Sequence, residues 1–348
     1  MIKVGIVGAH PDKGWAALAH VPALKMLPEY ALTAVSHHAL DVARAAAQKF
    51  GVPHAFGSTE ELVAAVDLVV VAVNVTHHRA IVTAALDAGK AVLAEWPLGI
   101  DLADATAMLD LARAKGVHTA IGLQARAAPM FAYVRDRLRA GHVGRVLSST
   151  LVGSGIYWGE TLPDASAYTL DPANGASMVN VTFAHSIDAV LWALDGRFDD
   201  LTAHKATVRK TARLVPSGRE VPMTVADQIS VAGVLDNGVF LNAHFRGGLS
   251  RATNFRWEVN GTEGDLVVTT PVSYTGAGGY RIESARGDDA LHAIDVPASY
   301  TGGFDDGLTQ SMALAYRALA SDLTTGTRLA PTFDDAITLH RLVDQVAR

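Results

Sequence analysis

The sequence predicts an α/β fold: an N-terminal doubly wound parallel sheet, followed by a C-terminal α+β domain with a mostly antiparallel, open sheet. The first half predicts the parallel sheet because short, continuously hydrophobic runs alternate there with alanine-rich helical stretches. Such strands are typical of a sheet that helices bury on both faces. In the second half, turn signals such as Asp236-Asn237-Gly238 and Asn260-Gly261 separate consecutive strands, which is typical of antiparallel pairing.

We place the first domain at residues 1–123. Its expected strands, each nearly continuous in hydrophobic residues, are 2–7, 31–36, 68–73, 91–94 and 119–123. Its expected helices, which lie between the strands, are 15–26, 40–50, 60–65, 79–88 and 102–115. Gly51, Gly89 and Gly116 follow three of these helices, as the left-handed C-terminal cap of a helix favours.

The second domain is predicted at residues 124–348. It opens with a helix at 129–140 and a strand at 145–152, and another helix is expected at 184–194. The later strands, rich in β-branched residues, are expected at 201–208, 224–235, 239–245, 256–259 and 265–268. Two final helices, 307–323 and 333–346, are expected to pack back on the first domain.

Composition narrows the class of protein. The chain has 348 residues, of which 49% are hydrophobic, enough for two domains of roughly 150 residues each. Its net charge is -6 and its 29 Lys and Arg residues are scattered, so no nucleic-acid partner is expected. It has no cysteine, which excludes disulfides and thiolate zinc sites. With neither a signal peptide nor a membrane span expected, we predict a cytoplasmic protein.

A glycine-bearing loop follows the first strand, in the stretch KVGIVGAHPDKGWAALAH. In a Rossmann domain, backbone N–H groups at this turn hold the pyrophosphate of a dinucleotide. The usual GxGxxG spacing is absent, so an ordinary strand-to-helix turn is the alternative interpretation. The candidate cofactor-binding residues of this loop are Gly8, Ala9, His10, Lys13, Gly14 and Trp15.

The second strand ends at Ser36, followed by His37 and His38. NAD-selective Rossmann folds carry an Asp or Glu near this point, which binds the ribose 2′-OH. No acidic residue occupies positions 36–40, so a 2′-phosphate is not repelled and NADP is slightly favoured over NAD. No arginine is present to clamp that phosphate, and a solvated loop is the alternative.

Metal chemistry and serine hydrolysis are not expected. The adjacent pairs His37-His38 and His77-His78 chelate poorly because neighbouring residues on an extended chain point to opposite sides. No HExxH spacing and no nucleophile-elbow motif occur. We therefore predict no metal site.

Five stretches together resemble the Gfo/Idh/MocA oxidoreductase family, in the expected order. The most specific is AALDAGKAVLAEWPL, and the others are VGIVGAH…GWAALAHVPAL, TAIGLQARAAPMF, LRAGHVGRVLSS and NGASMVNVTFAHSIDAVLWALDG. The phrases KGWAALAHVPAL and GLQARAAP look closest to the branch that contains fungal galactose-pathway repressors, which bind a dinucleotide without catalysis.

The resemblance implies a Rossmann domain that binds NAD or NADP, and a second domain whose open sheet joins subunits into a homodimer or homotetramer. It implies a small-molecule substrate, often a sugar or polyol derivative, and no membrane partner. The cofactor contacts that it implies, beyond the first loop, are Asn74, Val75, His78, Glu95, Trp96, Pro97 and Gln124.

Two departures from the family pattern stand at catalytic positions. The family's lysine, which lies beside the nicotinamide and moves the substrate proton, is Trp96 here. An Asp that precedes the family's histidine by four residues is Val181. The histidine itself is kept as His185, whose pKa near neutrality suits a general acid or base, and Asp188 could orient it. A structural histidine is the alternative.

Other candidates come from the start of the second domain. Tyr157 and Trp158 lie in a glycine-rich loop where the family places substrate contacts; Tyr157 is a second candidate proton donor, and aromatic packing is the alternative, favoured for Trp158. Arg126 is expected either to bind a substrate oxygen or to form a surface salt bridge. The predicted substrate-binding set is Trp96, Arg126, Tyr157, Trp158 and His185.

Two functions remain open on this evidence. The first is an NAD(P)-dependent dehydrogenase or reductase, which moves a hydride to or from a sugar-like carbonyl, hydroxyl or imine, with His185 handling the proton. The second is a non-catalytic dinucleotide-binding sensor or regulatory protein, because Trp96 and Val181 replace two ionisable groups. The retained His185 favours the enzyme.

Overall fold

The computed structural model describes residues 1–271 and 279–348. The chain divides into two compact units, and each is described by itself. Unit 1 comprises residues 1–124 and 308–341, and unit 2 comprises residues 125–307 and 342–348.

Unit 1 contains a parallel sheet of six strands in the order β3-β2-β1-β4-β5-β6. The strands are β1 (Ile2–Val7), β2 (Tyr30–Ser36), β3 (His54–Phe56), β4 (Leu68–Val71), β5 (Ala91–Glu95) and β6 (Thr119–Gly122). Strand order reverses between β1 and β4, which is where dinucleotides bind in this class of sheet. The prediction of a doubly wound parallel sheet is confirmed.

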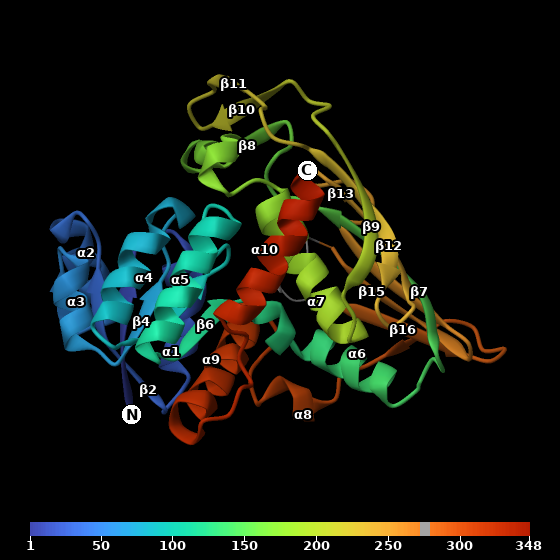
Figure 1. Cartoon of the computed structure of the whole chain (residues 1–348), viewed down its shortest axis with the longest axis horizontal. Helices are drawn as coiled ribbons and strands as arrows, with labels where there is room; N and C mark the ends of the chain where they lie inside the picture. Colours follow the sequence, from blue (N-terminus) through green and yellow to red (C-terminus); the bar gives the residue numbers. More distant parts are fainter. Residues whose placement is uncertain (272–278) are drawn as a thin grey trace. The chain divides into compact units, whose positions relative to one another are not determined.

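Helices surround this sheet (Figure 1). They are α1 (Val21–Lys25), α2 (Leu40–Phe50), α3 (Thr59–Ala65), α4 (His78–Asp87), α5 (Leu102–Lys115) and α9 (Leu308–Thr325), with α10 (Phe333–Ala347) divided between the units after Arg341. Side chains cap the starts of α3 and α5: Ser58 accepts a hydrogen bond from the Glu61 amide, and Asp101 accepts one from the Asp104 amide. Gly51 and Gly116 end α2 and α5 in the left-handed conformation, as expected from the sequence.

Unit 2 contains an eight-stranded sheet in the order β17-β16-β15-β14-β7-β13-β12-β9. Its strands are β7 (Val146–Ser154), β9 (Phe198–Ala206), β12 (Gln228–Leu235), β13 (Phe240–Arg246), β14 (Phe255–Gly261), β15 (Gly264–Thr270), β16 (Arg281–Arg286) and β17 (His292–Ile294). Neighbouring strands run antiparallel except β7 and β13. The mostly antiparallel second sheet is therefore also confirmed.

Two helices, α6 (Pro129–Arg139) and α7 (Ala184–Leu194), lie against one face of this sheet (Figure 1). From α6, the ring of Phe131 stacks on Trp257 at 5.5 Å between centroids; just before α7, Phe183 meets Phe245 edge-on at 5.5 Å. Alternate residues of β13 follow this arrangement, because Phe245 is buried whereas His244 is exposed. Alternate side chains of such a strand therefore pack on the helices, and the side chains between them form an open face.

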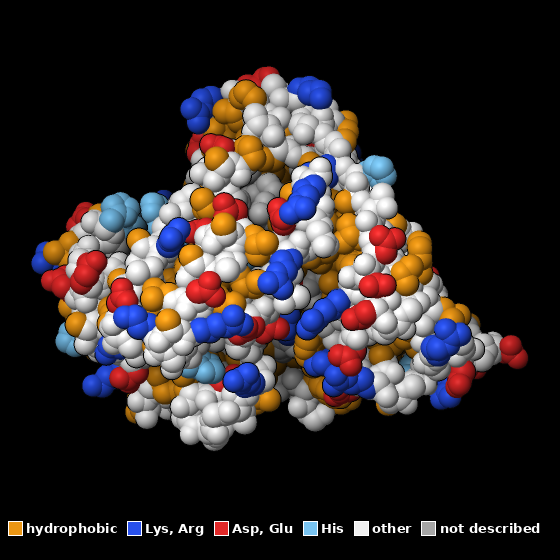
Figure 2. All heavy atoms as spheres, viewed as in Figure 1, with side chains coloured by type: hydrophobic (Ala, Val, Ile, Leu, Met, Phe, Trp, Pro, Cys, Tyr) orange, Lys and Arg blue, Asp and Glu red, His pale blue; other side chains and the backbone are white. Residues whose placement is uncertain are grey.

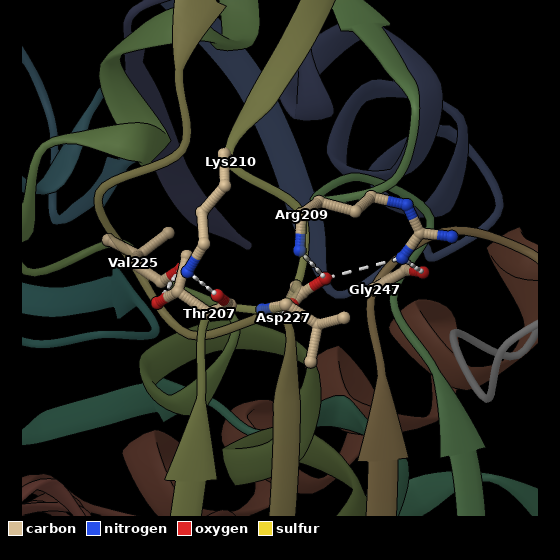
Figure 3. A network of polar contacts seen from close by, with 7 residues as sticks. Thr207, Arg209, Lys210, Val225, Asp227 and Gly247 are labelled. Carbon is tan, nitrogen blue, oxygen red and sulfur yellow. Dashed lines mark hydrogen bonds and ion pairs between the residues drawn. The ribbon is translucent and has the colours of Figure 1, made fainter.

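A buried carboxylate, Asp227, holds the chain where β9 leaves the sheet (Figure 3). Its two oxygens accept the backbone amides of Val208 at 2.7 Å and Arg209 at 3.1 Å, and the Arg209 guanidinium lies at 3.3 Å. The amide of Gly247, after β13, donates to the backbone oxygen of Asp227 at 2.7 Å. This network ties the ends of β9, β12 and β13 together before the chain enters a small sheet of β8 (Thr161–Pro163), β10 (Thr211–Val215) and β11 (Glu220–Pro222).

The structure corrects several expected boundaries. The strand expected at 224–235 begins only at Gln228, because the residues before it belong to the Asp227 network. The helix expected at 15–26 is a π-helical turn, Ala16–His20, followed by the short α1. A second π-helical turn, Val179–Phe183, leads into α7. The sheets also contain strands that we did not predict. They are the short strands β3, β8, β10, β11 and β17, and strand β16.

On the face of the molecule drawn in Figure 2, Lys and Arg side chains are interspersed with Asp and Glu. No helix in the described residues is long and apolar enough to span a bilayer.

Candidate functional site

The glycine loop follows β1 at the switch point of the parallel sheet. Gly8 has φ of 97°, and a Cβ there would come within 2.5 Å of Val73 Cγ1 and 2.7 Å of the Ala72 oxygen. Only glycine lets the loop pass this close to the end of β4. The amides of Gly8 and Ala9 donate to the Ser36 oxygen at 2.9 and 3.2 Å, which fixes the loop against the end of β2.

Gly14 closes the loop with φ of 88°, and a Cβ there would meet no atom within 4 Å. The loop is thus fixed against the sheet at Gly8 and open at Gly14. The π-helical turn begins two residues later, and Leu18 donates its amide to the Gly14 oxygen at 3.2 Å. Such π-helical turns occur often at functional sites.

Apart from Glu95 Oε1, which lies 3.1 Å from His20 Nε2, three polar side-chain atoms at predicted cofactor positions are buried without a hydrogen-bond partner in the described chain. They are Trp15 Nε1, Ser36 Oγ and Gln124 Oε1. Trp15 and Gln124 lie in the segments after β1 and β6, and Ser36 is the last residue of β2. Because buried polar groups are nearly always hydrogen-bonded, water or a polar ligand is expected to complete the hydrogen bonds of these atoms. The residues therefore fit a dinucleotide.

Three histidines lie at the end of β2 and in the glycine loop. The rings of His37 and His38 are 4.2 Å apart between centroids, and His10 lies edge-on to His37 at 6.3 Å. His38 is exposed, and His10 and His37 are half-buried. Lys13, in the same loop, is exposed. The structure thus brings together the loop and the β2 end that the sequence placed in one site.

The segment Glu95-Trp96-Pro97 follows β5, and the Trp96-Pro97 peptide bond is cis. Trp96 is 5% exposed, and its ring lies 4.5 Å from that of His340 in α10. Burial lowers the pKa of His340 to about 4, so that ring is neutral near pH 7. The position of the family's lysine is therefore occupied by a packed aromatic pair that carries no charge.

Beneath this segment lies a buried polar series that the sequence did not reveal. The fully buried ring of His20 has Nε2 at 3.1 Å from Glu95 Oε1 and Nδ1 at 2.7 Å from the Tyr316 hydroxyl. Burial raises the pKa of Tyr316 well above its usual value, so its hydroxyl keeps its proton next to His20 Nδ1 at neutral pH. Gly122 makes room for the Glu95 carboxylate, because a Cβ there would lie 2.5 Å from Oε1.

The segment after β4 holds three further predicted contacts. Asn74 is exposed at the start of a 3-10 turn and Val75 is buried. His78 is 1% exposed, with Nε2 at 3.1 Å from the Val73 oxygen and Nδ1 at 3.2 Å from the Leu98 oxygen. This placement argues against the direct cofactor contact expected for His78. The ring instead holds the β4 and β5 ends together.

In unit 2, His185 lies in the first turn of α7, directly after the π-helical turn, and is half-buried. Asp188, one turn later, is buried and receives a two-point contact from Arg126: Nε to Oδ2 at 2.9 Å and Nη2 to Oδ1 at 2.6 Å. The sequence singled out both residues without pairing them. The Arg126 salt bridge is therefore partly buried rather than on the surface, and Asp188 fixes the guanidinium.

In the loop after β7, the two aromatic residues predicted to contact the substrate differ in exposure. Trp158 is 1% exposed with φ of 62°, and its Nε1 lies 3.4 Å from the Thr169 oxygen. This burial corresponds to the packing alternative and leaves no surface on Trp158 for a substrate. Tyr157 is half-buried, with its ring 5.9 Å from Trp158, so it is the more accessible of the two.

No cluster of three or more potential metal-ligating side chains occurs among the residues that the structure describes. Within unit 1, the switch-point loop, the unpartnered polar groups and the strand-end residues define a dinucleotide-binding Rossmann unit of the oxidoreductase type.

Comparison with known proteins agrees with this class. Residues 2–123 match the family described as "Oxidoreductase family, NAD-binding Rossmann fold", and residues 129–270 match "Gal80p, C-terminal domain". The N-terminal part of the chain therefore resembles the Gfo/Idh/MocA oxidoreductases, and the part after it resembles the Gal80 proteins. The predicted resemblance to this family and branch is confirmed.

Two curated relatives and one solved structure illustrate the range of this group. The galactose/lactose metabolism regulatory protein GAL80 of Saccharomyces cerevisiae is 29% identical over 76% of this chain and 66% of its own length. The dehydrogenase aclE of Aspergillus oryzae is 28% identical over 100% of this chain and 95% of its own. A crystal structure of a super-repressor mutant of Gal80p from S. cerevisiae superposes with a TM-score of 0.90 at 24% identity, covering 99% of this chain and 95% of that one.

Proposed function

We propose that the protein is an NAD(P)-dependent oxidoreductase that transfers a hydride to or from a sugar-like or other small carbonyl, hydroxyl or imine substrate. The observation that carries this proposal is the set of three buried, unpartnered polar atoms of Trp15, Ser36 and Gln124, which lie at or after the carboxyl ends of β1, β2 and β6 in unit 1. A dinucleotide would satisfy them. The alignment of the whole chain with a dehydrogenase supports a catalytic role.

Unit 1 would hold the dinucleotide through the backbone of the loop from Gly8 to Gly14 and through the Ser36 hydroxyl. When bound, the nicotinamide accepts or supplies the hydride. Glu95 lies at the end of β5, and its carboxylate is positioned by His20. The neutral Trp96–His340 pair excludes water from the segment after Glu95 without adding a charge.

Unit 2 would supply the proton chemistry. His185 is the proposed proton donor or acceptor because an imidazole can exchange its proton near neutral pH. Arg126, held in one orientation by Asp188, would bind an oxygen of the substrate. Tyr157 is the proposed second donor. With no lysine at position 96, His185 or Tyr157 would supply the one proton that reduction of a carbonyl or imine needs.

The experiment is a turnover assay that follows the absorbance of NADPH or NADH with a panel of sugars, keto sugars and cyclic imines. We expect His185→Ala to lower kcat by 10²- to 10⁴-fold, about the contribution of one general acid or base, while the dinucleotide Kd changes little. The matched control is His292→Ala, which alters an exposed histidine of β17. Turnover that His185→Ala leaves unchanged would remove His185 from the mechanism.

A dinucleotide-binding regulatory protein is the second candidate. The observation that favours it is the buried Trp96–His340 pair, which fills the family's lysine position with groups that transfer no proton at neutral pH. Relatives of this kind include the GAL80 regulators, which the chain matches over about two thirds of their length. Tight dinucleotide binding without turnover on any substrate of the panel would select this function.

The open face of the eight-stranded sheet is the surface that we propose for assembly into a homodimer or homotetramer. It carries large apolar side chains at Val234 and Phe240, which pair across β12 and β13 and are 42% and 48% exposed. Asn242 and His244 lie beside them in β13. We expect light scattering to give a mass of two or four chains, and a double change of Val234 and Phe240 to Asp to give the mass of one.

A further inference from the structure

The three histidines at the end of β2 form the densest group of titratable side chains near the proposed dinucleotide edge. His10, His37 and His38, the histidine cluster, have ring centroids 6.3 and 4.2 Å apart along the series. They come from two segments that the Gly8 and Ala9 amides bind to each other through the Ser36 oxygen. Their position follows from the fold of the loop rather than from chance exposure.

Two of these rings have a defined proton position in the neutral state. His10 Nδ1 accepts the amide of Asp12 at 3.1 Å, and His37 Nδ1 accepts the amide of Ala39 at 3.1 Å. A neutral ring that accepts through Nδ1 carries its proton on Nε2. Each ring therefore offers one N–H donor, which suits a ribose hydroxyl, and gains a positive charge only by taking up a second proton.

The surroundings of the cluster favour the neutral form of its central ring, His37, more than in a free imidazole. Burial and the neighbouring His38 and His10 lower the pKa of His37 below its usual value, while Asp41 in α2 opposes this weakly. Asp12, in the loop, is held 2.8 Å from Lys49 of α2, so its charge is balanced. On β3, His54 is exposed and its ring stacks on Phe56. Lys13 is exposed in the loop, and no carboxylate occupies positions 36–40.

We propose that the histidine cluster makes the choice between NADP and NAD depend on protons. It would bind the ribose hydroxyl of NAD in its neutral form, and it would take up protons to bind the 2′-phosphate of NADP. This inference rests on the proposed dinucleotide site and adds a specificity rule to it. The position is the one at which Rossmann folds distinguish the two cofactors, here without the usual acid or arginine.

The sign of the effect follows from linkage. A phosphate dianion near an imidazole favours its charged form and raises its pKa, so NADP binding takes up protons between about pH 6 and 8. The affinity for NADP then rises as the pH falls, by up to about tenfold per pH unit for each proton taken up. NAD presents a neutral hydroxyl, so its affinity changes little over the same range.

The test is titration calorimetry of the intact protein with NADPH and NADH at pH 6, 7 and 8, in two buffers of different ionisation enthalpy. We expect the ratio of the NADH Kd to the NADPH Kd to increase about tenfold or more from pH 8 to 6, with net proton uptake on NADPH binding only. The triple variant His10→Gln, His37→Gln and His38→Gln keeps polar side chains but cannot gain charge, so both effects should disappear.

The 2′-phosphate itself titrates with a pKa of about 6. Its contribution cancels in the comparison of wild type with variant, because both receive the same ligand. His292→Gln, an exposed change in unit 2, is the matched control and should behave as wild type. If both dinucleotides bind and their Kd ratio is independent of pH, or depends on pH equally in the triple variant, the inference is overturned and the proposed site stands. If neither dinucleotide binds to wild-type protein, both fall.

Discussion

The two large sheets of this protein bury their strands in different ways. In the six-stranded sheet, all four residues of β4 from Leu68 to Val71 are completely buried, because helices cover both faces. In the eight-stranded sheet, β13 alternates, with Leu241 buried and Phe240 48% exposed. A sheet with helices on both faces can bind a ligand only at the ends of its strands. A sheet with helices on one face keeps its other face for a partner.

The largest difference between the two sheets should appear when a charge is introduced. Val70→Asp puts an unpaired carboxylate in the interior of β4, and we expect a loss of about 4 kcal/mol or more in the free energy of unfolding. Val234→Asp, on the open face of β12, should cost the separated chain about 1 kcal/mol or less, because its main effect would be on assembly. Urea denaturation followed by circular dichroism measures both. Equal losses would mean that the second face of β12 is covered as well.

Unit 1 should also respond to acid through His340. Its folded pKa of about 4 lies below the usual value of 6.5, so the unfolded chain binds a proton more readily in the range between them. Stability is therefore complete above pH 6.5 and falls as the pH drops to 4, by about 3 kcal/mol from this group.

The variant His340→Gln isolates this effect from that of His78, whose pKa burial lowers in the same direction. We expect the difference in unfolding free energy between wild type and variant to shrink steadily from pH 6.5 to 4. A difference that does not change with pH would show that His340 is not buried in the neutral form.

In unit 2, the most sensitive polar group should be Asp227. In Asp227→Asn, the amide cannot accept hydrogen bonds on both sides, so one of the donors from Val208 and Arg209 loses its acceptor. We expect a loss of about 2 kcal/mol, the range for hydrogen bonds to charged groups. Asp200→Asn, on the exposed surface of β9, should be neutral. Urea midpoints compare the two, and matched midpoints would contradict the network in Figure 3.

The smallest effect concerns the covered face of the eight-stranded sheet. Trp257 is fully buried and its Nε1 donates to Ser149 Oγ at 2.9 Å. Trp257→Phe keeps the stacking on Phe131 but removes this bond, and we expect about 1 kcal/mol of destabilisation. A thermal melt is sensitive enough to detect it, and an increase in stability would mean that the bond contributes nothing in the folded state.

Both sheets could be predicted from the sequence because short runs of residues carry the hydrophobic pattern of most strands. The runs that became β1 and β4 are continuous in hydrophobic residues, and β13 follows a turn that ends in glycine at Gly238. The three-residue strand β3 carries no such signal, since a run of His, Ala and Phe has neither alternation nor length. The π-helical turns were missed because the stretch from Ala16 to His20 reads as ordinary helix.

For the site, the sequence supplied candidates. Trp15 and Ser36 were chosen from the Rossmann pattern and Gln124 from the family resemblance, and in the described residues a polar atom of each is buried without a partner. Pairings across the sequence were not predictable. Arg126 and Asp188 are 62 residues apart, and nothing near either residue indicates the other. The same holds for the partners of His20.

The contact between His20 and Tyr316 spans 296 residues of sequence. The N-terminal unit therefore cannot acquire its complete interior until α9 has been synthesised, which happens only after residues 125–307 of unit 2. Until then Tyr316 cannot hold His20, the residue that faces the carboxylate of Glu95. Contacts over such separations slow folding and leave apolar surface exposed in the nascent chain, so this protein should depend on chaperones more than the regularity of its first sheet suggests.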